Sequence, residues 1–463
     1  MVKTRFAPSP TGLVHVGNIR TALFNYLMAA HGAGDFLLRI EDTDLERSKP
    51  EFEEALKVDM EWLGLNWQEG ADIGGPNGPY HQSERADIYN DYYQKLEDED
   101  LAYPCFCSEE QLALSRKLQR ARGLAPRYAG TCRSLSQEEI QTKISEGIKP
   151  SLRFRIPDNE TVEFEDLVKG KQQFKTNDIG DFIIRRSSGA SSFMFCNGID
   201  DAMMKVTLAS RGEDHLTNTP RQLLILKALK LPAPEYAHIS LIFGSDGSPL
   251  SKRNGSRSIR DLREMGYLPE AIVNYLARLG HYYESNAFMS LEALAKNFDM
   301  KNLSTSPAKY DVSQLNYWQK QALASLSDEA FMSYISVFID GVPEDKKSAF
   351  VTMVKPNIQF NHEVEQWKDV LFGELALESN EIIANAGKAF FELCIECVNQ
   401  DMAYKEMLNV LKEKLSVKGK GLFMPVRFAL TGEQHGPELA PIFEILGKEN
   451  LIKRFEQALK LCA

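Results

Sequence analysis

The sequence predicts an α/β domain built on a parallel sheet, interrupted by an α+β insertion and followed by an all-α C-terminal region. Three observations predict this order. The chain opens on a strand–turn–helix–strand pattern, the pattern changes between about residues 105 and 175, and amphipathic helical segments fill nearly everything after residue 254. Strand–helix–strand units form parallel sheets, so we expect the opening domain to be Rossmann-like.

The first βαβ unit lies in the opening stretch "TRFAPSPTGLVHVGNIRTALFNYLMAAHGAGDFLLRIEDTD", residues 4–44. Residues 4–7 predict a short buried strand, residues 18–32 a helix and residues 35–42 the next strand. We expect the helix to end at Gly32, because glycine commonly follows the last helical turn. The side chains expected on one face of this helix are Ile19, Leu23, Tyr26, Leu27 and Ala30.

The turn between the first strand and the helix contains Pro8, Pro10, Gly12, His15 and Gly17. A connection that only joined two elements would not need a fixed, glycine-opened shape carrying an imidazole. In parallel sheets, phosphates bind beyond the carboxyl end of a strand, where the helix N-terminus presents free N–H groups and its dipole. The turn therefore predicts a phosphate site.

The middle segment differs from the sheet domain around it. It holds a cysteine pair, a basic helical stretch and the alternating runs "SLRFRIP" and "TVEFEDLV". We interpret this segment as an insertion, because strand-like and helical pieces resume at "FIIRRSSGASSFMFCNGIDD" and "TPRQLLILKALKL".

A Gly/Ser-rich loop, "LIFGSDGSPLSKRNGSRSI", separates the sheet domain from the helical C-terminal part. Two segments of that part, "LPEAIVNYLARLG" and "NEIIANAGKAFFELCIECVNQ", have helical periodicity. We expect the C-terminal third to be all-α.

The length and composition bound the class of protein. A chain of 463 residues with 43% hydrophobic and 26% charged residues predicts about two to four folded domains. No apolar run approaches the roughly 18 residues of a membrane span, and we expect no membrane partner. Seven cysteines occur without a signal peptide, so we expect a cytoplasmic protein with reduced thiols. We also expect a monomer.

The net charge of −11 argues against a protein coated with nucleic acid. Phosphate contacts are local, however, because salt screens charges within about 8–10 Å. Two stretches are basic: residues 111–137 contain Arg116, Lys117, Arg120, Arg122, Arg127 and Arg133 without an acid, and residues 412–427 contain Lys414, Lys418 and Lys420. They suggest a polyanionic partner that is contacted at a few separated places, although either stretch alone would also fit a solvated helix face.

The His15–Gly17 turn and the distant loop with Ser251, Lys252 and Arg253 together suggest a two-sided grip on a triphosphate. Gly17 lets a phosphate approach the backbone, and His15 supplies a donor close to it. Lys252 is a cation able to meet charge on departing pyrophosphate.

Three stretches, "RFAPSPTGLVHVGN", "RGEDHLTNTPRQ" and "SPLSKR", resemble bacterial glutamyl-tRNA synthetases, which are class I aminoacyl-tRNA synthetases. "HVGN" stands where the family has its HIGH signature and "PLSKR" where it has KMSKS. The resemblance covers essentially the whole chain, to "KGLFMPVRFALTGEQHGPEL". It implies activation of L-glutamate with ATP and Mg²⁺, then transfer of the glutamyl group to the 3′ end of tRNA(Glu), with release of AMP and pyrophosphate.

The same resemblance implies a division into four parts. Residues 1–104 and 190–253 would form the split Rossmann-like catalytic domain, and residues 105–189 an inserted domain for the tRNA acceptor end. Residues 254–315 would form a helical stem-contact region and residues 316–463 an all-α anticodon-binding domain.

The family's site residues map onto this sequence one by one. Arg5 matches the arginine that recognises the side-chain carboxylate of glutamate, and Glu41 matches the residue that holds its α-amino group. The remaining matches in the glutamate pocket are Ala7, Ser9, Phe193, Asn197 and Arg211. The matches in the ATP site are His15, Gly17, Asn18, Ser251, Lys252 and Arg253, with His15 and Lys252 as the catalytic pair.

The chain departs from the family pattern at three of these places. Asn18 ends the HIGH-like motif, as is common in this subgroup. Pro249 replaces the first KMSKS lysine, so Lys252 with Arg253 must serve alone. Phe193 stands where a tyrosine is usual, so a hydroxyl is missing from the glutamate pocket.

Cys105, Cys107 and Cys132 reproduce the spacing of a structural zinc site found in the insertion of many relatives. The usual fourth ligand is replaced by Ser134, a poor zinc ligand, whereas Tyr128 stands where some relatives use a tyrosine. Zinc held by three thiolates and Tyr128, and a degenerate site with reduced thiols, remain alternatives. The pair Cys394 and Cys397 is expected in a helical core.

The resemblance to glutamyl-tRNA synthetases implies that the basic stretch in residues 111–137 contacts the tRNA acceptor end. It also implies that the C-terminal domain contacts the anticodon loop. The nearest rival activity is charging of tRNA(Gln), alone or together with tRNA(Glu). Less favoured rivals are a glutaminyl-tRNA synthetase, a truncated paralogue that modifies a tRNA base, a non-catalytic tRNA-binding paralogue and a small-molecule nucleotidyltransferase.

Overall fold

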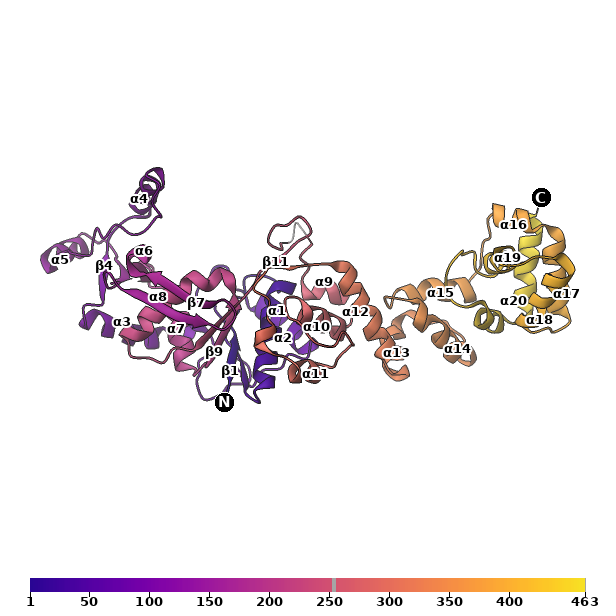
Figure 1. The fold of residues 1–463 in the computed structure, drawn as a ribbon, viewed down its shortest axis with the longest axis horizontal. Helices are drawn as coiled ribbons and strands as arrows, with labels where there is room; N and C mark the ends of the chain where they lie inside the picture. The colour runs from indigo at the N-terminus through magenta and orange to yellow at the C-terminus, as the bar shows by residue number, and fades with distance from the viewer. Residues whose placement is uncertain (252–254, 463) are drawn as a thin grey trace. The chain divides into compact units, whose positions relative to one another are not determined.

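A computed structural model describes residues 1–251 and 255–462 of the chain. The chain divides into two compact units, Met1–Glu264 with Pro269–Leu315, and Met265–Leu268 with Asn316–Ala463. The first unit contains the described strands and the second is built of helices (Figure 1). The predicted fold class, an α/β domain with an insertion and an all-α C-terminal part, is confirmed.

The first unit combines a parallel core with antiparallel additions. β1, β2 and β3 pair in parallel in that order, and a second sheet has the order β7-β6-β10-β9. The strands are β1 (Lys3–Phe6), β2 (Asp35–Leu38), β3 (Glu69–Gly70), β4 (Ala102–Cys105), β5 (Ser151–Phe154), β6 (Thr161–Asp166), β7 (Gly170–Lys175), β8 (Phe182–Arg185), β9 (Leu208–Gly212), β10 (Glu235–Ile239), β11 (Ile242–Phe243) and β12 (Ala308–Lys309).

The two parallel sheets meet where β1 lies beside β9. The Thr207 N–H donates to the Lys3 carbonyl at 2.9 Å, and the Lys3 N–H donates to Thr207 Oγ1 at 2.8 Å. β9 and β10 are parallel. Lys3 of β1 is bonded to Thr207 and Arg5 to the Ser210 carbonyl of β9, so the carboxyl ends of β1 and β9 open at one edge. This edge is where ligands bind in parallel sheets.

The first unit contains helices that flank these sheets and helices of the insertion. They are α1 (Val16–His31), α2 (Pro50–Trp62), α3 (Ala86–Asp98), α4 (Glu109–Ala121), α5 (Gln137–Ser145), α6 (Thr176–Ile179), α7 (Phe193–Met203), α8 (Thr219–Ala228), α9 (Ile259–Glu264), α10 (Pro269–Arg278) and α11 (Leu291–Lys296). The first βαβ unit was predicted correctly, and Gly32 follows α1 as expected. The predicted buried face of this helix was too narrow, because α1 is buried on most sides. Ala30, which was expected on that face, is exposed.

The predicted insertion forms two structures. β4, β5 and β8 make an antiparallel sheet, whereas the β6–β7 hairpin joins the parallel sheet, because β6 pairs with β10. The antiparallel sheet shares one core with α3, α7 and α8. The insertion is therefore joined to the sheet domain by strand pairing and by a shared hydrophobic core.

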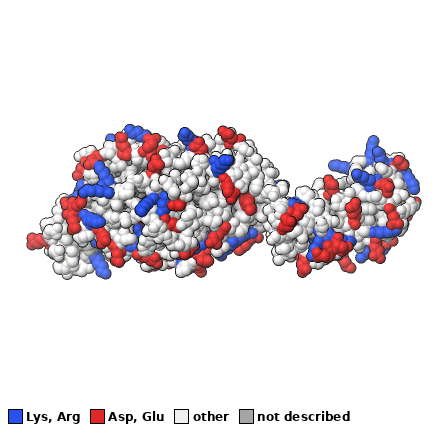
Figure 2. Space-filling model, turned by 90° about the horizontal axis from the view of Figure 1, so that it is seen from below, with Lys and Arg blue, Asp and Glu red and all other residues white. Residues whose placement is uncertain are grey.

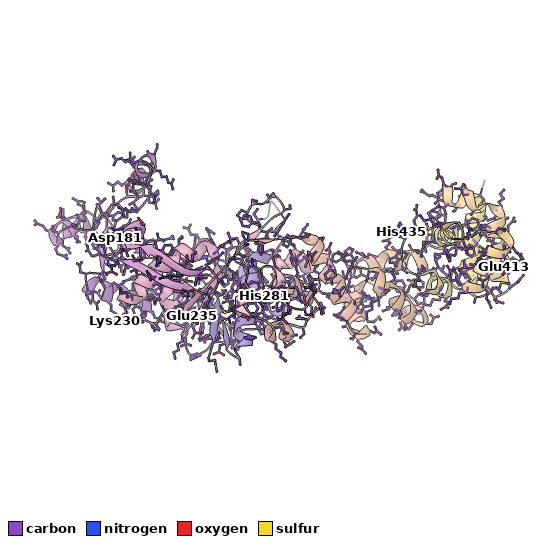
Figure 3. All side chains as sticks on the ribbon, viewed as in Figure 1. Asp181, Lys230, Glu235, His281, Glu413 and His435 are labelled. Atoms are coloured by element: carbon purple, nitrogen blue, oxygen red, sulfur yellow. The ribbon has the colours of Figure 1, made fainter. Side chains whose placement is uncertain are left out.

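Two helices of the insertion bury no side chain. α4 and α5 each begin with a serine capping box, at Ser108 and Ser136, which satisfies backbone N–H groups without help from packing. Figure 1 shows α4 lying apart from the β4–β5–β8 sheet. Asp181 lies toward this end (Figure 3) and accepts hydrogen bonds from the Tyr103 hydroxyl at 2.6 Å and the Ile156 N–H at 2.8 Å.

The second unit packs helices around apolar contacts, with α17 and α20 side by side. Its helices are α12 (Val312–Ser325, which begins in the first unit), α13 (Asp328–Ile335), α14 (Glu344–Val354), α15 (Glu363–Phe372), α16 (Glu381–Ala386), α17 (Lys388–Asn399), α18 (Tyr404–Leu415), α19 (Lys420–Thr431) and α20 (Leu439–Leu461). The stretch 380–400, predicted as one helix, is two, because Gly387 has φ +74° between α16 and α17. Cys394 and Cys397 are buried in α17, as expected.

Acidic and basic side chains are interspersed over the visible face of the first unit (Figure 2). None of the helices in the described ranges combines the length and apolarity needed to cross a lipid bilayer.

Candidate functional site

A cavity of about 810 Å³ opens at the carboxyl ends of β1 and β9 in the first unit. Its walls bring together three segments far apart in the sequence: the turn after β1, the end of β9 with the start of α7, and the loop after β11. The predicted site residues that line it are Arg5, Ala7, Ser9, His15, Gly17, Asn18, Glu41, Phe193, Asn197, Arg211 and Ser251. Lys252 and Arg253 lie outside the described residues.

Arg211, at the end of β9, is a buried cation that lines this cavity. Its Nε donates to His238 Nε2 at 3.2 Å, its Nη1 to Asn197 Oδ1 at 3.4 Å and its Nη2 to Thr219 Oγ1 at 2.8 Å. Among the residues that the structure describes, no carboxylate lies within 4 Å of this guanidinium. Burial lowers the pKa of Arg211 to about 10, so it is charged at neutral pH and lacks a close counter-ion. A buried charge of this kind favours an anionic ligand.

Asn197, in α7, joins Arg211 to Glu41. Its Nδ2 donates to Glu41 Oε1, and its Oδ1 accepts from Arg211 and from Gln222 Nε2, the latter at 2.9 Å. Glu41 is held after β2 by its backbone N–H, which donates to the Pro8 carbonyl at 2.9 Å. Burial raises the pKa of Glu41 against the opposing effect of Arg39. One amide therefore links a cation and an anion on the same cavity wall.

Arg5 lines the cavity, but three N–H groups of its guanidinium already donate to protein acceptors. Nε and Nη2 donate to the two oxygens of Asp201 at 3.1 and 3.2 Å, and Nη1 donates to the Ser210 carbonyl at 3.0 Å. One N–H on each terminal nitrogen remains beyond these bonds. Arg5 is thus fixed by a buried bidentate ion pair, and any ligand shares it with Asp201.

The turn after β1 is held against the segment that follows the Gly/Ser-rich loop. His15 forms a β-bridge with Ser258, and the Ile259 N–H donates to the Val14 carbonyl at 3.1 Å. His15 is the N-cap of α1 and lines the cavity, as do Pro249 and Ser251 on the near side of the loop. The two motifs that the sequence placed far apart therefore meet at one cavity.

Gly17, in the first turn of α1, has ordinary helical backbone. A Cβ added there would meet no heavy atom within 4 Å, and the residue lines the cavity. Glycine here keeps the helix N-terminus open to a ligand, where free N–H groups attract phosphate.

Phe193 packs on His215, with the ring centroids 5.2 Å apart. Both line the cavity, and burial together with Arg211 lowers the pKa of His215 to about 4, which keeps its imidazole neutral. His215 lies inside the motif "RGEDHLTNTPRQ", but no role was predicted for it from the sequence.

Three further charged residues support the site. Arg39 donates to Asp201 at 2.7 Å and to Glu41 at 3.3 Å, and is fully buried. Arg20 lines the cavity and donates to the Leu279 carbonyl at 3.1 Å. Asp201 lies in the run "NGIDD", whose two acids beside apolar residues were the available signal of a buried ion pair.

A second cluster lies in the insertion, where Cys105, Cys107 and Cys132 place their sulfur atoms within 4.8 Å of one another. Cys107 Sγ is 3.7 Å from Cys132 Sγ, and the Tyr128 hydroxyl is 3.4 Å from Cys105 Sγ and 3.5 Å from Cys107 Sγ. A hydrogen bond from the Cys132 thiol lowers the pKa of Cys105. Arg153 Nε donates to Cys105 Sγ at 3.1 Å and its guanidinium lies 3.7 Å from the Tyr128 ring centroid.

Comparison with known proteins matches both units to described families. Residues 1–317 match the catalytic domain of class I tRNA synthetases (E and Q), and residues 322–459 match an anticodon-binding domain. The chain is 57% identical to a glutamate–tRNA ligase of Coxiella burnetii, over 99% of this chain and 100% of that one. It is 52% identical to one of Nitrosococcus oceani, over 100% and 98%. The crystal structure of the glutamate-tRNA synthetase of Elizabethkingia anophelis superposes with a TM-score of 0.90 at 31% identity, with 99% of each chain covered.

Proposed function

The chain belongs to the glutamate–tRNA ligases among the class I aminoacyl-tRNA synthetases, and on that premise we propose how its residues carry out the reaction. ATP activates L-glutamate to glutamyl-adenylate with loss of pyrophosphate. A ribose hydroxyl at the 3′ end of tRNA(Glu) then takes the glutamyl group and AMP leaves. The observation that supports this assignment is one cavity lined by both the charged Glu41–Asn197–Arg211 chain and the His15–Gly17 turn.

Glutamate carries two anionic groups and one cationic group, and the cavity offers a complement to its ends. We assign the side-chain carboxylate to Arg211 and to the remaining N–H groups of Arg5, because Arg211 is a buried cation without a close counter-ion. We assign the α-ammonium to Glu41, with Ser9 beside it. The α-carboxylate is then left free to react.

The ATP phosphates would lie at the N-terminus of α1, near Gly17 and Asn18. ATP enters as its Mg²⁺ complex, so the ion is part of the substrate. An oxygen of the α-carboxylate attacks the α-phosphorus, and the bond to pyrophosphate breaks. His15 and the helix N-terminus stabilise the charge that develops. Lys252 and Arg253, outside the described residues, are proposed to act from the other side, since Pro249 and Ser251 reach the cavity.

For tRNA we propose two contact regions. The first is the basic stretch of α4 and the residues after it, where Arg116, Lys117, Arg120 and Arg122 are exposed and form no ion pair with a described carboxylate. It would meet the acceptor end. The second is the turn between α18 and α19, where Lys418 and Lys420 are exposed, and it would meet the anticodon loop.

Zinc fits the cysteine cluster. Tetrahedral zinc with bonds of about 2.3 Å to sulfur and about 2.0 Å to oxygen separates two sulfurs by about 3.8 Å, and sulfur from oxygen by about 3.5 Å. The observed 3.7, 3.4 and 3.5 Å agree with these separations. We propose that Cys105, Cys107, Cys132 and Tyr128 hold Zn²⁺, that Arg153 balances the excess negative charge, and that the ion stiffens the insertion.

Metal content tests this proposal. Purified protein should hold about one zinc per chain, and Cys107→Ser should lose it. Cys394→Ser, which removes a buried thiol from α17, is the matched control and should keep it. No zinc in the parent protein, prepared without chelators, would contradict the proposal.

We keep the four-part division of residues 1–104 with 190–253, 105–189, 254–315 and 316–463 as a proposal, together with a monomeric state and a cytoplasmic location. Seven free cysteines support a reducing compartment.

A second candidate function is charging of tRNA(Gln), alone or with tRNA(Glu).

Two assays test these assignments. Charging of purified tRNA(Glu) and tRNA(Gln) with labelled glutamate separates the two functions, and ATP–pyrophosphate exchange with and without tRNA tests activation. We expect glutamylation of tRNA(Glu) and exchange that requires tRNA. If neither tRNA(Glu) nor tRNA(Gln) were glutamylated, the proposed function would be contradicted.

A further inference from the structure

Behind Arg211 lies a buried pair of residues, Asp166 and His238, to which neither the motifs nor the cavity lining assigns a role. The exposed fraction of His238 is 0% and that of Asp166 is 1%. His238 Nδ1 lies 2.6 Å from Asp166 Oδ2, and His238 Nε2 lies 3.2 Å from Arg211 Nε. A carboxylate, an imidazole and a guanidinium thus form one buried line that ends at the cavity.

The hydrogen bonds fix the tautomer of His238. Arg211 Nε carries a hydrogen and can only donate, so His238 Nε2 must accept. The imidazole proton is therefore on Nδ1, where it is donated to Asp166. Burial lowers the pKa of His238, although Asp166 opposes this effect, so the neutral ring is consistent with this arrangement.

Asp166 is itself held in one orientation. Its Oδ1 accepts from three backbone N–H groups, those of Val168 at 3.0 Å, Lys169 at 2.7 Å and His238 at 3.2 Å. Only Oδ2 is left for the imidazole. Burial opposes ionisation, but the hydrogen bonds from His238 and Lys169 keep the pKa of Asp166 below its ordinary value.

The line determines where Arg211 points. All three nitrogens of this guanidinium have a protein acceptor, and His238 is the one that holds Nε. One N–H on each terminal nitrogen remains for a ligand. If Nε lost its acceptor, the plane of the fork would no longer be fixed, and a bidentate contact depends on that plane.

We propose that Asp166 and His238 are positioning residues, which set the plane of the Arg211 guanidinium for the side-chain carboxylate of glutamate. This inference rests on the proposed function, in which Arg211 binds that carboxylate. Asp166 lies at the end of β6, in the predicted insertion, so the insertion contributes directly to the geometry of the glutamate pocket.

The isosteric variant Asp166→Asn tests the tautomer. The three backbone N–H groups should keep the amide oxygen at the place of Oδ1, which turns the amide NH₂ toward His238. The imidazole must then accept at Nδ1 and carry its proton on Nε2. The new Nε2–H could then be accepted only by Thr219 Oγ1, which lies 3.1 Å from His238 Nε2. Arg211 Nε would lose its acceptor and face an N–H group at 3.2 Å, so Arg211 must move.

We expect Asp166→Asn to raise the KM for glutamate about tenfold or more at saturating ATP and tRNA(Glu), with the KM for ATP within about twofold. Asp59→Asn is the control. Asp59 is also buried, at 1% exposure, but it lies in α2 outside the cavity lining, and this variant should leave both constants unchanged. Nitrogen-15 NMR of histidine-labelled full-length protein should show the His238 proton on Nδ1 in the parent protein and on Nε2 in Asp166→Asn, with the signal assigned by its loss in His238→Gln.

Several outcomes would overturn the inference: a proton on Nε2 in the parent protein, or an unchanged KM for glutamate in Asp166→Asn after the tautomer has switched. Arg211→Gln separates this failure from failure of the proposed function. If Arg211→Gln also leaves the KM for glutamate unchanged, the assignment of Arg211 itself is wrong. Should Asp166→Asn not fold, His238→Gln and His238→Leu decide, because only glutamine offers Arg211 an acceptor. Leucine should raise the KM for glutamate more, and equal values would overturn the inference.

Discussion

The arginines of the cavity and those of α4 are the same side chain in opposite settings. Arg5 and Arg211 are buried, and each nitrogen of their guanidinium groups donates to a named acceptor. Arg116 and Arg120 are exposed, on a helix that buries no side chain. The first pair has its orientation fixed before a ligand arrives, whereas the second is free to follow the ligand.

The difference separates selectivity from affinity. A buried guanidinium without a close counter-ion discriminates strongly between an anionic and a neutral ligand, since a mismatched partner leaves the charge unsatisfied. Exposed cations attract any polyanion, and their contribution falls with salt through release of counterions. The cavity should therefore select glutamate, and the exposed stretches should hold tRNA.

The largest effect is expected from Arg211→Gln. Removing one partner of a desolvated charge pair should lower kcat/KM for glutamate about 10³-fold, with little dependence on salt. Aminoacylation kinetics at two salt concentrations measure this effect. Arg263→Gln is the control, because Arg263 pairs with Asp59 at 3.5 Å outside the cavity. If high salt lowered kcat/KM for glutamate in the parent protein as much as Arg211→Gln does, the distinction between a selective cavity and salt-sensitive exposed cations would be wrong.

The pH dependence of glutamate binding gives the next effect, about a hundredfold at its limit. Burial raises the pKa of Glu41 above its ordinary 4.5. The ionised form is the one proposed to hold the ammonium group, so the KM for glutamate should rise as the pH falls through this raised pKa. Glu41→Gln should have a high KM that no longer changes over that range. A parent profile that stays flat down to the ordinary carboxyl pKa would contradict the assignment.

The sequence located the cavity because its two motifs depend on local chemistry. A turn with His15 and Gly17 is a weak signal alone, because a histidine near a glycine in a turn is more often structural. Its combination with the distant loop that contains Ser251 is what made the prediction specific. Cys105, Cys107 and Cys132 were singled out because they resemble the zinc site of the family, and the structure brings the three together. Local spacing is what a single sequence reports well.

Pairing across the fold could not be predicted. Nothing in the spacing of Arg5 and Asp201, which are 196 positions apart, says that they form a buried ion pair. The β6–β7 hairpin was predicted as part of an insertion, and its pairing with β10 depends on sheet register. Asp166 reaches the pocket through that pairing, so no local pattern singles it out.

Charge reversal on α4 should have a smaller effect, and on a different constant. Arg116→Glu with Arg120→Glu should raise the KM for tRNA about tenfold at moderate salt, while the KM for glutamate stays unchanged. The difference from the parent protein should shrink as salt increases. Lys171→Glu, at an exposed position of β7 where Lys171 lies 3.3 Å from Glu163, is the charge control. A change in the KM for glutamate with no change in the KM for tRNA would contradict the proposed contact between α4 and tRNA.

The smallest effect is expected at the turn between α18 and α19. Lys418→Glu with Lys420→Glu should raise the KM for tRNA about fivefold, with kcat retained, because the contact is proposed to add affinity at a distance from the reacting atoms. Steady-state kinetics over a range of tRNA concentrations measure it. Lys453→Glu on α20, which is also exposed, provides the comparison, and an equal effect in both variants would contradict a specific role for the turn.

A crystal structure with a non-hydrolysable analogue of glutamyl-adenylate, bound in the presence of tRNA(Glu), tests the central claim most directly. We expect the side-chain carboxylate on Arg211, the ammonium on Glu41 and the phosphate beside His15, with Lys252 reaching the same nucleotide. An analogue bound outside this cavity, or one whose phosphate lies away from both His15 and Lys252, would contradict the account.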